Sequence, residues 1–149
     1  MPELPEVETV KNVLIPIVKN RKILKIDVLR SSTIEGNVNE FVSNLQGQTF
    51  LNVSRIGKYL IFHLTNELVM LSHLRMEGKY YELLESDKDS KYARVVFHLY
   101  NGHKLCYDDS RCFGILKLST ESTYMQDEMI AKLESKIGRA VQQECRDRS

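Results

Sequence analysis

Apolar residues near the start of the chain recur at every third or fourth position, which is the spacing of an amphipathic helix. The positions on this apolar face are Val7, Val10, Leu14, Ile17 and Val18. Pro5 fits the first turn of such a helix, where a missing N–H leaves no bond unmade. Pro16 should kink the helix or end it near its last turn. The pattern therefore predicts one helix at the start of the chain.

Beyond this helix the apolar positions alternate with polar ones, which is the period of a half-buried strand. Leu24, Ile26 and Val28 alternate in this way with Lys25 and Asp27. Further strand-like runs lie at 49–55, 58–64, 67–74, 79–84, 93–99, 103–108 and 113–119. Short strands that are so numerous and so evenly spaced are typical of antiparallel sandwiches and barrels.

Two more helices and the turns complete the predicted fold. A short helix is expected at 37–46, with Gly47 at its end. Asn101-Gly102 is a strong hairpin signal between two strand-like runs. From about Thr123 the helical period returns, with Met125, Met129, Ile130 and Leu133 on one side. We therefore predict a mainly β fold, an antiparallel β-sandwich with flanking N-terminal and C-terminal helices.

Composition narrows the protein class without naming a function. An apolar share of 42% and a charged share of 28% are those of a soluble globular protein. The net charge of +1 leaves DNA binding open, because the 21 Lys and Arg residues could still gather on one face. No apolar run approaches the length that spans a membrane. Cys106, Cys112 and Cys145 lack a C-x-x-C spacing, so we expect reduced thiols and no zinc site.

The first ten residues, MPELPEVETV, hold candidate chemistry. Cells normally remove Met before Pro, which would leave Pro2 with a free secondary amine. An α-amine is partly unprotonated at neutral pH and can form a Schiff base with an aldehyde-like carbon. The iminium of a secondary amine stays cationic and acts as an electron sink, and Glu3 lies beside it as a proton carrier. The alternative is a polar terminus before a helix that starts with proline.

Four segments now occur in a meaningful order. The opening is followed by RIGKYLIF at 55–62, SHLRMEGKY at 72–80 and DDSRCFG at 108–114. In order and spacing they resemble the formamidopyrimidine-DNA glycosylases, bacterial enzymes that excise oxidised purines. The resemblance covers about residues 1–133. It implies a cytoplasmic DNA repair enzyme, acting as a monomer on duplex DNA that contains oxidised purines or abasic sites.

The resemblance also implies roles for individual residues. Pro2 matches the family's N-terminal nucleophile, and Glu3 matches the acid that assists base release and sugar-ring opening. Lys58 matches the lysine beside the phosphate of the lesion, which is also credited with acid catalysis during strand cleavage. Without the resemblance, Lys58 could equally be a solvated lysine at a strand end.

Further residues match the DNA-contacting loops of the family. Met76, Arg111 and Phe113 match the three residues that enter the gap left by an everted nucleotide. His73 and Arg75 flank Met76 and are expected to contact phosphates or a groove. Met76 and Phe113 could alternatively belong to the core, but charged neighbours and glycines around them are typical of loops.

Two positions depart from the family pattern within these segments. Cys112 stands where the family usually has a second arginine or a glutamine, which removes a charge from the loop. At 91–94 the family tends to read Lys-His-x-His, whereas this chain reads KYAR. Tyr92 could still reach a phosphate through its hydroxyl group, so we keep it as a predicted DNA contact.

The end of the chain departs most from the family pattern. We expect a catalytic domain at 1–133 and an atypical tail at 134–149, explained by a natural truncation, a frameshift or a cloned domain. The family's helix–two-turn–helix and zinc-finger region has no counterpart, so no cofactor is expected here. Residues 1–133 carry equal numbers of basic and acidic residues. Weak DNA binding is therefore expected, and the alternatives to a weak glycosylase with lyase activity are a non-catalytic remnant and a pure interaction domain.

Overall fold

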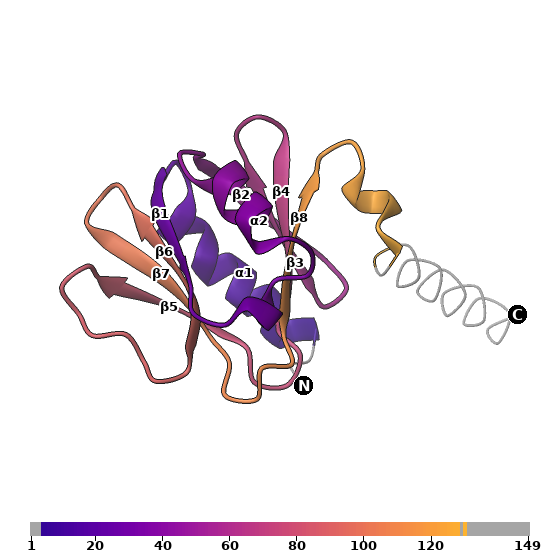
Figure 1. The fold of residues 1–149 in the computed structure, drawn as a ribbon. Helices are drawn as coiled ribbons and strands as arrows, with labels where there is room; N and C mark the ends of the chain where they lie inside the picture. Colours follow the sequence, from indigo (N-terminus) through magenta and orange to yellow (C-terminus); the bar gives the residue numbers. More distant parts are fainter. Residues whose placement is uncertain (1–3, 129, 131–149) are drawn as a thin grey trace, which may run out of the picture.

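Within the part of the chain that the structure describes, the named elements are two α-helices and eight strands, in the order that the hydrophobic pattern predicts (Figure 1). The structure is a computed structural model that describes residues 4–128 and 130. The α-helices are α1 (Leu4–Val18) and α2 (Val38–Leu45), and short 3-10 turns occur at Ser31–Thr33 and Tyr124–Gln126. The strands are β1 (Ile23–Val28), β2 (Phe50–Ile56), β3 (Tyr59–Leu64), β4 (Leu68–His73), β5 (Lys79–Leu84), β6 (Ala93–Leu99), β7 (His103–Asp108) and β8 (Ile115–Thr120).

The strands form two antiparallel four-stranded sheets that share one core. One sheet has the order β1-β6-β7-β5 and the other has the order β2-β3-β4-β8. Aromatic rings from both sheets meet between them: Phe50 lies 5.7 Å from Phe62 in its own sheet and 6.1 Å from Phe97 in the other, measured between ring centroids. This arrangement confirms the predicted antiparallel β-sandwich.

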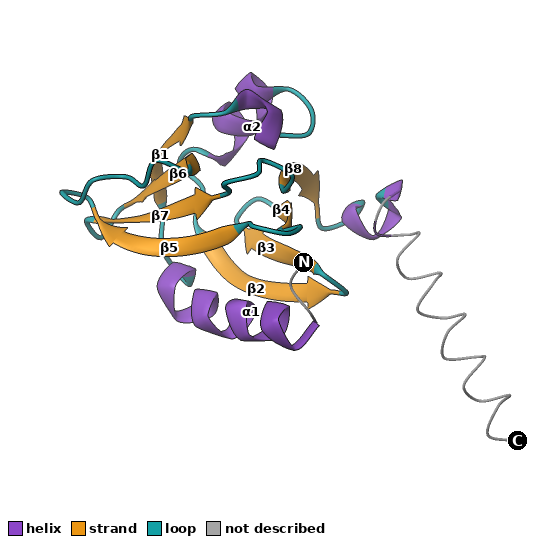
Figure 2. Cartoon of the chain, turned by 90° about the horizontal axis from the view of Figure 1, so that it is seen from below, coloured by secondary structure: helices purple, strands orange, loops and turns teal. Residues whose placement is uncertain are grey.

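Each helix closes one open side of the sandwich. Helix α1 packs mainly on β2, buries Val7, Leu14 and Val18 in the shared core, and shares a groove with residues of β5. Helix α2 contacts β1 and buries Phe41 and Leu45 in the same core. Figure 2 shows the two helices on opposite sides of the strands. The apolar faces predicted for both helices are therefore the faces that the sandwich buries.

The helix ends follow from local chemistry. Helix α1 ends at Val18, two residues after Pro16, which agrees with the end predicted near its last turn. Helix α2 begins after Asn37, whose Oδ1 accepts a hydrogen bond from the Glu40 amide at 2.9 Å. Gly47 follows α2 with a φ of +86°, a conformation that glycine adopts without strain. The predicted end of α2 is thus confirmed.

The strands confirm the predicted runs to within two residues, with one change of face in β1. Ile23 and Ile26 are buried there, whereas Leu24 is 52% exposed. The pairing of β1 with β6 shifts register between Ile23 and Lys25, which marks a β-bulge. The strict alternation predicted from Leu24 is therefore wrong, because the extra residue turns that side chain outward.

The segment after β8 becomes α-helical later than predicted, because the described residues Glu128 and Ile130 are helical whereas 121–127 are not α-helical. A 3-10 turn at Tyr124–Gln126 begins it, and Met125 is exposed. Ile130 is buried on the outer face of the β2-β3-β4-β8 sheet, in a cluster with Tyr59, Ile61, Val69 and Leu71. Met129, Leu133 and the tail at 134–149 lie outside the described residues.

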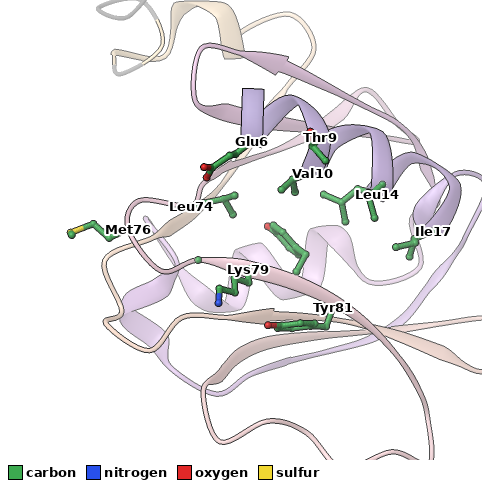
Figure 3. Close-up of a pocket in the computed structure, with 12 residues that line it drawn as sticks. Glu6, Thr9, Val10, Leu14, Ile17, Leu74, Met76, Lys79 and Tyr81 are labelled. Carbon is green, nitrogen blue, oxygen red and sulfur yellow. The ribbon is translucent and has the colours of Figure 1, made fainter. Parts of the chain in front are cut away.

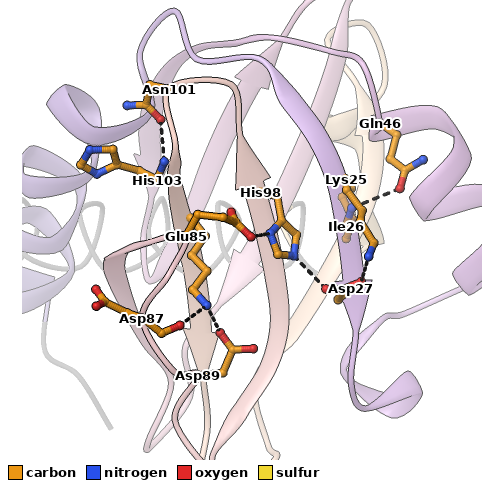
Figure 4. Close-up of polar contacts among 11 residues, drawn as sticks. Lys25, Ile26, Asp27, Gln46, Glu85, Asp87, Asp89, His98, Asn101 and His103 are labelled. Carbon is orange, nitrogen blue, oxygen red and sulfur yellow. Dashed lines mark hydrogen bonds and ion pairs between the residues drawn. The ribbon is translucent and has the colours of Figure 1, made fainter.

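The outer face of the other sheet carries a polar network (Figure 4). Lys104 Nζ donates to the Asp87 carbonyl at 2.7 Å and to Asp89 Oδ1 at 2.6 Å, which holds the β5–β6 loop against the sheet. His98 lies between Asp27 and Glu85, with contacts of 2.8 and 2.6 Å. Neither helix in the described residues is long and apolar enough to cross a membrane.

Candidate functional site

Two connections between the sheets bring the predicted loops together. The β4–β5 connection at 74–78 and the β7–β8 connection at 109–114 cross between the sheets in opposite directions. Their ends are paired on both sides, because His73 pairs with Ile115 and Lys79 pairs with Asp108. The two connections, which we call the crossover loops, must therefore lie side by side. Figure 1 shows this end of the sandwich beside the beginning of helix α1.

The crossover loops present two apolar side chains and a cation to solvent. Met76 is 49% exposed and Phe113 is 55% exposed, so neither belongs to the core. The Arg111 side chain is 56% exposed, and its Nε lies 3.9 Å from Glu77 Oε1 on the neighbouring loop. The loop placement predicted for all three residues is confirmed, and their contact with DNA stays a prediction.

Asp109 organises the loop that carries Arg111 and Phe113. Its buried carboxylate accepts hydrogen bonds through Oδ1 from the amides of Arg111 (3.2 Å) and Cys112 (2.9 Å). Its Oδ2 accepts from the Gly114 amide (2.7 Å) and from the Tyr107 hydroxyl group (3.0 Å). One side chain thus satisfies three backbone donors, which fixes the loop in a single shape.

Both crossover loops rest on Tyr107. A Cβ atom added to Gly114 would lie 1.7 Å from the Tyr107 hydroxyl oxygen, and one added to Gly78 would lie 2.6 Å from it. The ring of Tyr107 is fully buried and cannot move aside. Glycine is therefore required in each loop, because the backbones approach the hydroxyl group too closely for any side chain.

A tight turn holds His73 and Arg75 at the end of β4. The Arg75 amide donates to Nδ1 of His73 at 3.0 Å, and Arg75 adopts a left-handed φ of +55°. The His73 ring is mostly buried and meets the ring of Tyr59 edge-on, with centroids 4.7 Å apart. Burial lowers the pKa of His73 to about 4, and the charges of Arg75 and Lys58 add to that shift. His73 therefore shapes the turn as a neutral ring.

The buried His73 predicts a loss of stability in mild acid. In the unfolded chain its pKa is near 6.5, so unfolding takes up a proton as the pH falls from 6.5 towards 4. Between pH 7.5 and 5.0 this costs about 2 kcal/mol of unfolding free energy. In His73→Asn an oxygen still accepts the Arg75 amide but does not titrate. Urea unfolding at both pH values measures how much unfolding free energy each protein loses between pH 7.5 and 5.0. This loss should be about 2 kcal/mol smaller in His73→Asn than in the unmodified chain. Equal losses in the two proteins would contradict this explanation.

Lys58 lies beside these loops. It occupies the two-residue turn between β2 and β3, next to Gly57, whose φ is +57°. Because Tyr59 pairs with His73, the β2–β3 turn ends next to the start of the β4–β5 loop. The half-buried Lys58 is close enough for its charge to act on the His73 ring. A cation on a turn of this kind can bind a phosphate group.

The beginning of helix α1 completes this end of the molecule. Glu6 and Met76 both lie at a groove of about 450 Å³ between α1 and β5. The side chain of Met76 extends outward from the rim of this groove (Figure 3). The predicted catalytic residues Pro2 and Glu3 lie outside the described residues. Leu4 is the first described residue of α1, so the chain enters the helix at the end where the crossover loops lie.

Tyr92 and Arg94 border the loop of Asp109. The Asp109 amide donates to the Tyr92 carbonyl at 3.0 Å, and Arg94 Nε donates to the Asp109 carbonyl at 2.9 Å. The guanidinium carbon of Arg94 lies 5.9 Å from the centroid of the partly exposed Tyr92 ring. The predicted contact of Tyr92 with a phosphate stays a prediction, and Arg94 adds a cation next to it.

Several residues that shape the site were missed in the sequence. Asp109, Tyr107 and Gly114 are the clearest cases, since none was predicted to have a role. The segment DDSRCFG does hold a usable signal, because an aspartate before a turn often accepts hydrogen bonds from amides that follow it. No three His, Cys, Asp or Glu side chains among residues 4–128 and 130 are placed to bind a metal ion.

Comparison with known proteins identifies the family. The sequence profile of the formamidopyrimidine-DNA glycosylase N-terminal domain matches residues 1–116. The chain belongs to this family. It is 44% identical over 133 residues to formamidopyrimidine-DNA glycosylase of Ligilactobacillus salivarius (strain UCC118), covering 89% of this chain and 48% of the relative. The Lactobacillus gasseri enzyme is 42% identical over 123 residues, covering 83% of this chain and 45% of the relative.

Solved structures of the family share the fold. The Lactococcus lactis glycosylase in complex with DNA containing an abasic site matches with a TM-score of 0.81 and 32% identity, over 84% of this chain and 46% of the other. The same enzyme with DNA containing Fapy-dG matches with a TM-score of 0.80 and 32% identity, over 83% and 46%. The chain thus spans about half the length of the curated relatives it matches.

Proposed function

We propose that this chain carries the lesion-processing half of a formamidopyrimidine-DNA glycosylase, which removes oxidised purines from duplex DNA. In this proposal the unprotonated amine of Pro2 attacks C1′ of the damaged nucleotide, and the C1′–N bond to the base breaks. Glu3 moves the proton that opens the sugar ring, which leaves an iminium between Pro2 and C1′. The cationic iminium draws electrons from the C2′–H bond, so that the bond to the 3′ phosphate can break by elimination.

The observation that carries the proposal is the pair of crossover loops. An everted nucleotide leaves a void in the base stack, and eversion costs a few kcal/mol. Apolar side chains that enter the void lower this cost, and an arginine can hydrogen-bond the unpaired partner base. Met76, Phe113 and Arg111 are exposed together on two rigid loops, which is the set of side chains that this task requires.

The position of Lys58 supports the proposal independently. A nucleotide whose gap is filled by the crossover loops has its phosphates within reach of the neighbouring turns. Lys58 lies on the turn next to the β4–β5 loop, and helix α1 begins at the same end of the molecule. Lys58 and the start of helix α1 therefore lie at the end of the molecule where, in this proposal, the everted sugar would bind.

Borohydride trapping tests the proposal. Reduction of the iminium gives a stable covalent link between protein and DNA, and an abasic site needs no base expulsion. We expect the 149-residue chain to give a slowly formed adduct with an abasic duplex in low salt, and none with undamaged duplex. Positioning contributes roughly 7–11 kcal/mol to rates of this kind, so a half-length chain should react slowly. Absence of any adduct at high protein concentration would favour the non-catalytic alternative.

A further inference from the structure

One arginine joins helix α1 to the turn that carries Lys58. Arg55 lies on β2, and its Nε donates to Glu8 Oε2 on helix α1 at 2.5 Å. Its Nη1 donates to the Gly57 carbonyl at 2.9 Å. That carbonyl belongs to the peptide group between Gly57 and Lys58. A single planar guanidinium therefore binds the helix with one nitrogen and the turn with another.

The Glu8 carboxylate has a second partner that makes no such link. Lys11 Nζ lies 2.6 Å from Glu8 Oε1, and Lys11 belongs to the same helix. Hydrogen bonds from Lys11 and then from Arg55 lower the pKa of Glu8, so the carboxylate is ionised at neutral pH. Lys11 and Arg55 thus place one positive charge each on the same group, but only the contact of Arg55 crosses between elements.

The Gly57 carbonyl lies in the turn at a point that affects the direction of Lys58. Gly57 has a left-handed φ of +57°, and the peptide group that follows it sets the direction in which Lys58 leaves the hairpin. The side chains of Arg55 and Glu8 are 28% and 38% exposed. Ion pairs with this much exposure add little to overall stability. The contact is therefore better suited to setting local geometry than to holding the fold together.

We propose that Arg55 is a positioning residue that fixes Lys58 relative to the first turns of helix α1. Helix α1 and the Lys58 ammonium group belong to different parts of the chain, so their separation depends on how α1 sits against the β2–β3 turn. By binding Glu8 and the Gly57 carbonyl together, Arg55 sets that separation. This inference rests on the proposed function, in which Pro2 and Lys58 act on the same nucleotide.

The test compares Arg55→Gln, Glu8→Gln and Arg55→Lys with Lys11→Gln as the matched control. Lys11→Gln removes the same charge from the same carboxylate but leaves the link between the elements intact. Two quantities are measured on each protein. The first is the maximal rate of borohydride trapping and the abasic DNA concentration that gives half of it. The second is amide hydrogen exchange at residues 56–60.

Arg55→Gln should lower the maximal trapping rate about tenfold, because a small misplacement of a reacting group is costly. The half-saturating DNA concentration should stay within about twofold, since Arg55 is not proposed to bind DNA. Exchange in the turn should become faster in Arg55→Gln and Glu8→Gln, and a protein that carries both substitutions should exchange no faster than either single variant. Arg55→Lys should be intermediate, because an ammonium group lacks the planar fork. Lys11→Gln should leave both quantities unchanged.

Other outcomes overturn the proposal. Unchanged exchange at residues 56–60 in Arg55→Gln would show that the arginine does not hold the turn, whatever the trapping assay gives. A raised half-saturating DNA concentration at a normal maximal rate would make Arg55 a phosphate contact. If Lys11→Gln changed trapping and exchange as much as Arg55→Gln does, the positive charge beside Glu8 would explain the effect, and the link between the helix and the turn would not. If the unmodified chain forms no adduct, the proposed function fails, and the exchange measurement alone decides whether Arg55 holds the turn.

Discussion

A chain whose Pro2 nitrogen is acylated should form no trapped adduct with abasic DNA. An uncleaved Gly-Ser-Met extension before Pro2 turns the secondary amine into an amide, whose nitrogen has no lone pair for attack on C1′. We expect at least about a 100-fold drop in trapped product, to the background of the assay. The measurement is the fraction of labelled abasic oligonucleotide shifted on a denaturing gel after borohydride reduction.

The matched control is the same chain trimmed to begin at Pro2, with intact mass confirming each terminus. The two proteins share every described residue, so their unfolding curves and their salt-dependent DNA binding should coincide. Trapping that survives in the extended chain would mean that another amine attacks the sugar. The Schiff base at Pro2 would then have to be abandoned for this chain.

Asp109→Asn should disorganise the β7–β8 crossover loop. The carboxylate accepts from three backbone amides and from the Tyr107 hydroxyl group, and an amide side chain would turn two N–H donors towards some of them. Buried donors left without an acceptor cost about 1–3 kcal/mol each. We expect about 3 kcal/mol or more of lost unfolding free energy in urea and about tenfold less trapping, since Arg111 and Phe113 lose their fixed position.

Asp108→Asn is the control for this substitution. It removes the same charge one position earlier, and Asp108 Oδ1 is buried without a hydrogen-bond partner among the described residues. Its effect on stability should be small or favourable, because a buried carboxylate oxygen without a partner is costly. Equal losses in both variants would show that the effect comes from charge. Normal trapping by a folded Asp109→Asn protein would show that the loop needs no fixed shape.

The periodicity of apolar residues and the turn-forming residues predict most of this fold, because both signals are local in the sequence. Alternation located the strand-like runs, and Asn37 and Gly47 mark the ends of α2 through their own backbone preferences. The bulge in β1 escapes such reasoning, because it depends on the partner strand β6. Residues on loops, such as Met76 and Phe113, were distinguished from core by their charged and glycine neighbours.

The site itself depends on long-range pairing that the sequence does not display. Residues 74–78 and 109–114 meet because four strands from two sheets pair at their ends. The need for glycine at 114, in the β7–β8 loop, depends on the hydroxyl group of Tyr107, seven positions earlier on strand β7. Arg55 was read as part of a family segment, yet its contact with Glu8 joins residues 47 positions apart. Such roles become visible only when the elements are assembled.

The most direct test of the central claim is to locate the sugar on the trapped protein. After borohydride reduction, nuclease digestion and trypsin cleavage, mass spectrometry should find the reduced sugar on the peptide from Pro2 to Lys11. Fragment ions should place it on the N-terminal nitrogen. An adduct on Lys58, or on lysines scattered over the surface, would contradict the account, because the amine at the start of α1 would then not be the group that reacts.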